Sequence, residues 1–173
     1  MANGATPPTF GAYLHAIEAR GLTLLGDARG AQSALDSAQR SFDQAGGDEP
    51  DWNGYYGEAD LVADIGQCLR DIGRPLQGLA MLEQTERSLP ENRVTARAKT
   101  KIHIAAAYLA LGEYEQADRI TADALTAAGA LSSVRTLERV KALQHRVSRL
   151  GEHRALSQLD ERVTEFLRNG TAS

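Results

Sequence analysis

This chain of 173 residues is poor in several residue types, and each shortage excludes a class of protein. Its one cysteine, Cys68, rules out a disulfide within the chain. Aromatic residues make up only 5% of the sequence, which argues against a β-sandwich held by large side chains. No apolar run approaches the length of a membrane span, and the N-terminal "MANGATPPTF" lacks the layout of a secretory signal. We therefore expect a cytoplasmic protein without a membrane partner.

Positive charge and catalytic motifs are scarce as well. Asp and Glu number 23 against 19 Lys and Arg, a net charge of −4, whereas nucleic-acid binding needs a basic face. We expect no direct nucleic-acid binding by this chain. The sequence holds no HExxH, GxSxG or glycine-rich phosphate loop, so no catalytic residue, cofactor or metal site is predicted. The apolar neighbours of Cys68 indicate a buried structural thiol rather than a redox or nucleophilic one.

The sequence does contain a repeated glycine-centred pattern. The stretches "LLGDARGAQSAL", "DIGRPLQGLAML", "ALGEYEQADRIT" and "RLGEHRALSQLD" surround Gly26, Gly73, Gly112 and Gly151. Glycine suits the left-handed backbone that ends many helices, so each of the four marks a turn between two helices. Apolar residues recur every three or four positions around these turns, and no window alternates as a strand would. The pattern predicts an all-α protein of eight helices, at residues 9–24, 28–45, 57–71, 75–88, 93–110, 114–128, 132–149 and 153–168.

The composition, 42% hydrophobic and 24% charged, is that of a folded chain, and the length fits one domain. We place that domain at residues 9–168, after a disordered segment at 1–8 and before a frayed tail at 169–173. Small residues recur at matched depths in its helix pairs. They are Ala19 and Ala31, Gly66 and Gly78, and Ala105 and Ala117. Because two antiparallel backbones approach closely only where both side chains are small, we expect each pair to meet.

These helix pairs resemble tetratricopeptide repeats, whose pattern is W-x2-L-G-x2-Y, then A-x3-F, then P. The match is fullest in the second pair, at Val62, Ile65, Gly66, Leu69, Gly78, Leu82 and Pro90. The resemblance implies a right-handed α-solenoid of antiparallel helix pairs, with about three repeats and a degenerate capping pair. It also makes Pro90 the end of a repeat. The residues "LPEN" at 89–92 by themselves end one helix at Pro90 and offer Asn92 as the N-cap of the next.

A narrower resemblance involves the runs "GDARGAQSALDSAQRSFDQAG" and "YYGEADLVADIGQCLRDIGRP". They are similar to the C-terminal repeat domains of actinobacterial transcriptional regulators, in which a helix-turn-helix DNA-binding domain precedes the repeats. This implies the sensor or protein-interaction domain of a bacterial regulator. The 173 residues hold no helix-turn-helix segment, so the chain is expected to be either a fragment of such a regulator or a stand-alone relative.

The first helices of successive pairs line the concave side of a solenoid, where a peptide, small molecule or partner protein would bind. The side chains expected there are Tyr13, Arg20, Tyr55, Tyr56, Asp60, Asp64, Gln67, Arg70, Lys99, Ile102, His103, Ala106, Lys141, His145 and Arg149. The alternative is that they form solvated helix faces. Tyr55 and Tyr56 lie near Trp52 in "DWNGYYGEAD", an aromatic segment that either contacts a ligand or dimer partner or seals adjacent repeats.

Three functions remain open. The first is a non-catalytic binding module, which architecture and resemblance favour. The second is a structural or dimerisation scaffold, with helices at 132–168 pairing with another copy to give a homodimer. The third is an enzyme on the same scaffold, which would need a convergent cluster such as Asp64, His103 and His145.

Overall fold

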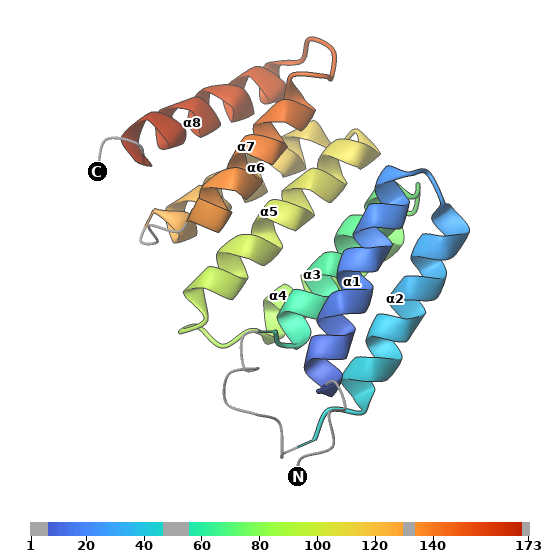
Figure 1. Cartoon of the computed structure of the whole chain (residues 1–173). Coiled ribbons are helices and arrows are strands. Elements are labelled where there is room, and N and C mark those ends of the chain that lie inside the picture. Colours follow the sequence, from blue (N-terminus) through green and yellow to red (C-terminus); the bar gives the residue numbers. More distant parts are fainter. Residues whose placement is uncertain (1–6, 47–55, 130–133, 171–173) are drawn as a thin grey trace. The chain divides into compact units, whose positions relative to one another are not determined.

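The computed structural model describes residues 7–46, 56–129 and 134–170, and the elements in these ranges are helices, with no strand among them (Figure 1). The helices are α1 Pro8–Leu24, α2 Ala28–Asp43, α3 Glu58–Asp71, α4 Pro75–Ser88, α5 Val94–Leu111, α6 Tyr114–Ala128, α7 Val134–Val147 and α8 Arg154–Gly170. The predicted all-α class is thus confirmed, and helix ends differ from the predicted ones by a few residues. Within the described ranges, no helix has the length and apolar character needed to cross a membrane.

The chain divides into two compact units. Unit 1, residues 1–74, contains α1 to α3, and unit 2, residues 75–173, contains α4 to α8. Two of the matched small pairs lie within one unit each, whereas Gly66 lies on α3 of unit 1 and Gly78 on α4 of unit 2.

Unit 1 is built on the hairpin of α1 and α2, with α3 packed on α1 (Figure 1). The two hairpin helices meet through small side chains, and Ala19 and Ala31 are completely buried. Side chains as small as these allow two backbones to lie close together, and their burial agrees with the packing of α1 on α2. The turn is closed by Asp27, whose carboxylate accepts a hydrogen bond of 2.9 Å from the Gly30 N–H and so caps α2.

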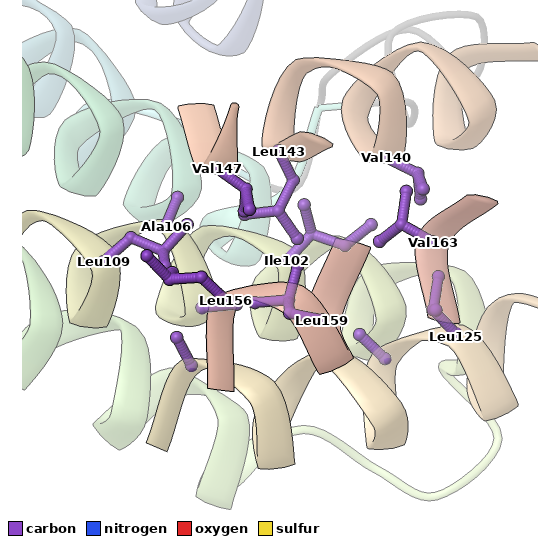
Figure 2. Close-up of a cluster of buried hydrophobic side chains, with 13 residues drawn as sticks. Ile102, Ala106, Leu109, Leu125, Val140, Leu143, Val147, Leu156, Leu159 and Val163 are labelled. Carbon is purple, nitrogen blue, oxygen red and sulfur yellow. The ribbon is translucent and has the colours of Figure 1, made fainter. Parts of the chain in front are cut away.

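Unit 2 stacks one hairpin on another. The α5–α6 hairpin carries fully buried Ala105 and Ala117, and the α7–α8 hairpin packs on it, with α7 against α5 and α8 against α6. α4 packs on α5. Buried apolar side chains from α5 to α8 form one core (Figure 2). Its larger members are Ile102, Leu109, Leu125, Val140, Leu143, Val147, Leu156, Leu159 and Val163.

Three of the four turn glycines have the expected left-handed backbone, with φ of 78° at Gly26, 85° at Gly73 and 77° at Gly112. Gly151 does not. α7 ends earlier than predicted, at Val147. The Leu150 N–H then donates to the Val147 carbonyl at 3.0 Å, which closes a turn. Because this turn precedes Gly151, the glycine does not need a left-handed backbone to end the helix.

The expected N-cap at Asn92 is wrong. The residue that precedes α5 is Arg93, which makes no side-chain capping bond. Asn92 lies instead inside a turn closed by the Arg93 N–H and the Pro90 carbonyl at 3.0 Å. The position is therefore used to reverse the chain after Pro90 rather than to begin the helix.

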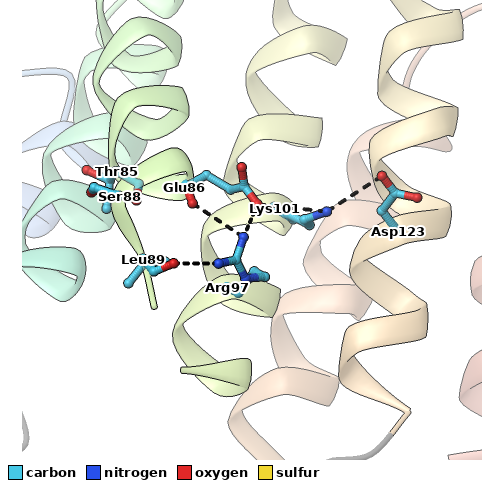
Figure 3. Close-up of polar contacts among 7 residues, drawn as sticks. All are labelled: Thr85, Glu86, Ser88, Leu89, Arg97, Lys101 and Asp123. Atoms are coloured by element: carbon cyan, nitrogen blue, oxygen red, sulfur yellow. Dashed lines mark hydrogen bonds and ion pairs between the residues drawn. The ribbon is translucent and has the colours of Figure 1, made fainter. Parts of the chain in front are cut away.

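An arginine that the sequence pattern gives no reason to single out ties α4 to α5 (Figure 3). The Arg97 guanidinium donates to the Glu86 carboxylate at 2.6 Å and to the Leu89 carbonyl at 2.5 Å. Leu89 directly follows α4, so Arg97 satisfies a carbonyl at the C-terminal end of that helix. Lys101 extends the network with longer contacts, 3.9 Å to Glu86 and 3.6 Å to Asp123 of α6.

We expect Arg97→Met to lower the free energy of unfolding by about 2 kcal/mol, because it removes two charge-assisted hydrogen bonds and leaves Glu86 poorly paired. Lys101→Met is the matched control and should cost at most about 0.5 kcal/mol, since its ion pairs are long and Asp123 is half exposed. Urea denaturation followed by circular dichroism measures both. Equal losses of stability in the two variants would contradict the conclusion that Arg97 holds α4 and α5 together.

Candidate functional site

Each unit carries an open hollow between two first helices of the predicted hairpins. In unit 1 it lies between α1 and α3, and we call it the α1–α3 hollow. Its volume is about 400 Å³. The lining residues are Ile17, Arg20, Gly21, Thr23, Leu24, Gln67, Cys68 and Asp71. The hollow combines apolar side chains with one cation and one carboxylate, so it can accept a ligand that has both polar and apolar parts.

The corresponding hollow in unit 2, the α5–α7 hollow, also measures about 400 Å³. It is lined by Ala106, Leu109, Ala110, Ala142, His145, Arg146, Arg149 and Leu150. Alanines and leucines form the apolar part, and every ionisable group in the described lining is basic. The two hollows therefore occupy equivalent places in their units but differ in charge.

A polar and aromatic cluster lies between α1 and α3. The Tyr56 hydroxyl donates to the Asp64 carboxylate at 3.0 Å, and the ring packs edge-on against Tyr13 with centroids 5.4 Å apart. Burial raises the pKa of Tyr56 well above its usual value, and the charge of Asp64 raises it further. The phenol therefore stays protonated and serves as a hydrogen-bond donor to Asp64, which is only 7% exposed. Asp60 has a local role, accepting from the Gly57 N–H at 3.1 Å at the start of α3.

Cys68 is one of the residues that line the α1–α3 hollow, and it is completely buried. Burial raises the pKa of its thiol from 9.0 to about 11. Because the thiolate is the nucleophile, the side chain is held in its unreactive form at neutral pH. The burial agrees with the predicted structural thiol.

Alkylation of Cys68 by iodoacetamide at pH 8 is expected to be about a hundredfold slower in the folded chain than in the chain unfolded in urea. The pKa difference lowers the thiolate fraction by about that factor. Since the native pKa is the higher one, the contribution of Cys68 to stability is complete below about pH 9 and is lost as the pH rises towards 11. The chain has one cysteine, so mass spectrometry reports the rate of Cys68 alkylation directly. Equal rates in the two states would refute the burial.

The structure brings together six of the residues predicted to contact a ligand in unit 1. Arg20 and Gln67 line the α1–α3 hollow. The others are Tyr13, Tyr56, Asp60 and Asp64, in or beside the polar cluster. Arg70 is buried and pairs with its neighbour Asp71 at 2.9 Å. Tyr55 and Trp52 lie outside the described residues.

In unit 2 the predicted residues are more scattered. His145 and Arg149 line the α5–α7 hollow. Lys141 is exposed and pairs with Glu138 at 2.9 Å, one turn away on α7. His103 is buried and Lys99 half-buried on α5, and neither lines the hollow.

Two residues placed on the concave face by register belong to the core. Ile102 and Ala106 are 4% and 6% exposed and pack in the cluster of Figure 2. α7 covers this side of α5, which a register argument on one helix could not show. Ala106 retains a place in the lining of the α5–α7 hollow.

The lining residues missed by the sequence analysis include Ile17, Leu24, Cys68 and Asp71 in unit 1 and Ala142, Arg146 and Leu150 in unit 2. A signal for two of these residues was present. Ala142 and Arg146 are spaced with the predicted His145 and Arg149 as neighbours on one face of a helix.

No family model matches the chain, and no curated protein or solved structure shows a significant similarity to it. The functional argument therefore depends on the two hollows and on the residues around them. Within the described residues, no group of three or more His, Cys, Asp or Glu side chains is arranged to hold a metal ion.

Proposed function

We propose that the chain is a non-catalytic binding module of the tetratricopeptide-repeat type, an α-solenoid that serves as the sensor or protein-interaction domain of a bacterial transcriptional regulator. It takes a peptide, small molecule or partner protein along the first helices of its hairpins. The observation that carries the proposal is the equivalent position of the two hollows, each between consecutive first helices of one unit.

The packing of unit 2 supports the repeat architecture. First helix lies against first helix and second against second, as in a stack of hairpins. The hollows also suit binding rather than structural filling, because Leu24 remains 88% exposed on the edge of one and Arg149 is exposed at the edge of the other. A ligand that buried such side chains would gain free energy in proportion to the apolar area covered.

Native mass spectrometry of the chain, purified under mild conditions from its own host, tests this role. We expect the folded chain to carry an additional mass that is lost on unfolding. The double variant Arg20→Ala and Arg149→Ala, which alters both hollows, should retain much less of it, whereas the exposed Arg29→Ala variant should retain it fully. A chain of bare mass, with no molecule retained, would contradict the proposal.

One observation favours the alternative of a dimerisation scaffold. α1 and the residue that follows it expose a row of apolar side chains, with Leu24 and Leu25 at 88% and 82% exposure. The row also contains Tyr13, Leu14 and Ile17. Helices α7 and α8, which the sequence analysis offers for dimerisation, turn most of their apolar residues into the core instead. Light scattering at increasing protein concentration distinguishes the two functions. A scaffold should form a dimer that dissociates in the Leu24→Lys, Leu25→Lys double variant. A binding module should be monomeric both as the original chain and as the double variant.

A further inference from the structure

We propose that the α5–α7 hollow selects a ligand whose anionic head group, such as a carboxylate, is carried on a short apolar chain. The inference rests on the binding role proposed above and names the chemistry of its ligand. It is argued from the apolar floor of the hollow, the basic groups around it and the contrast with the α1–α3 hollow.

The floor is apolar and kept open by small side chains. Ala106 and Leu109 of α5 are buried members of the core, and Ala110 and Ala142 leave exposed methyl groups between the two helices. Leu150, half-buried against the same core, also lines the hollow. An aliphatic chain lying between these methyl groups would be transferred out of water without displacing any side chain. The volume of about 400 Å³ is large enough for several carbon atoms.

Basic groups surround this floor. Among the described residues, His145, Arg146 and Arg149 line the hollow and no acidic side chain does, although the chain as a whole has a net charge of −4. The last turn of α7 holds His145 and Arg146, where positive charge also stabilises the helix end. Arg149 lies beyond that helix end, is exposed, and has no ion pair with any described residue. Its guanidinium can bind a carboxylate through two parallel hydrogen bonds.

The α1–α3 hollow provides an internal comparison. Arg20 shares the described lining with the carboxylate of Asp71, whereas the described lining of the α5–α7 hollow contains no carboxylate. An anion would therefore meet a like charge at the α1–α3 hollow that it does not meet in the lining of the α5–α7 hollow. The same head group and apolar chain occur in a short fatty acid and at the C-terminus of a peptide that ends in an apolar residue.

A titration with sodium octanoate, followed in ¹H–¹⁵N correlation spectra of the whole chain, tests the assignment. We expect the amides of Ala106, Ala110 and Ala142 to shift, with binding about tenfold weaker in Arg149→Gln. Arg135→Gln removes the same charge from an exposed position nearer the start of α7 and should change the affinity less than twofold. The tripeptide Gly-Ala-Leu, with a free or an amidated C-terminus, then identifies the source: tighter binding of the free peptide than of octanoate favours a peptide.

Three results would overturn the proposal. Equal shifts with octylammonium would refute the selection for an anion while leaving a binding role for the hollow. If Arg135→Gln and Arg149→Gln lowered the affinity for octanoate equally, the effect would come from the overall charge around α7 and not from Arg149 in the hollow. If no probe shifts these amides, the hollow binds no such ligand, and the mass retained by the native chain still reports separately on the proposed function.

Discussion

Leu159→Ala is expected to lower the free energy of unfolding by about 3 kcal/mol. Leu159 is completely buried on α8, in the core cluster that joins the α5–α6 and α7–α8 hairpins. Alanine would remove most of the side chain and leave a cavity, because surrounding residues relax only in part. Urea denaturation measures the loss of unfolding free energy. The amides of α7 and α8 should also be less protected from hydrogen exchange in the variant than in the original chain.

Leu76→Ala is the matched control. Leu76 lies on α4 in the same unit but is 68% exposed, so the same atoms are removed from a side chain that is mostly in water. The change should stay within about 0.5 kcal/mol. A loss in Leu159→Ala as small as that in the control would mean that α8 does not share this core.

Ala105→Leu is expected to cost about 2–3 kcal/mol. Ala105 is completely buried in the α5–α6 hairpin, which also buries Ala117 completely. A larger side chain would force the helices apart or adopt a strained rotamer, since packed interiors hold few voids. Leucine also has good helix propensity, so a loss of stability would come from packing rather than from the helix itself.

Ala110→Leu, five residues further along α5, separates an effect on helix packing from an effect on helix propensity. Ala110 is exposed, so the substitution should change stability by no more than about 0.5 kcal/mol. If Ala105→Leu were equally harmless, the matched small residues would not mark the helix crossing, and the main physical reason for the predicted hairpin would be lost.

The helices were predictable from sequence because their determinants are local. Glycine at positions 26, 73 and 112 ends helices through a left-handed backbone, and apolar spacing of three and four defines the segments between. The small residues indicated which helices form hairpins, because how closely two adjacent antiparallel helices approach depends on side-chain size at a few positions. The prediction for Gly151 failed because a turn between Val147 and Leu150 already precedes it. The prediction for Asn92 failed because this residue lies within the turn from Pro90 to Arg93, and Arg93 is the residue that precedes α5.

The candidate site was only partly predictable because it depends on contacts between segments distant in sequence. The pairing of Tyr56 with Tyr13 and Asp64 requires α1 and α3 to lie together. Ile102 was placed in the groove since no pattern within α5 tells which part of its surface α7 covers. Arg97 went unnoticed because its partner at the end of α4 is a backbone carbonyl, which carries no sequence signal.

The central claim is that ligands bind along the first helices of the hairpins. Nuclear Overhauser contacts from bound octanoate to alanine methyl groups test it most directly. We expect contacts with Ala106, Ala110 and Ala142 of α5 and α7. Contacts confined to Ala122 and Ala127 of the second helix α6, with none to these three methyl groups, would contradict the account.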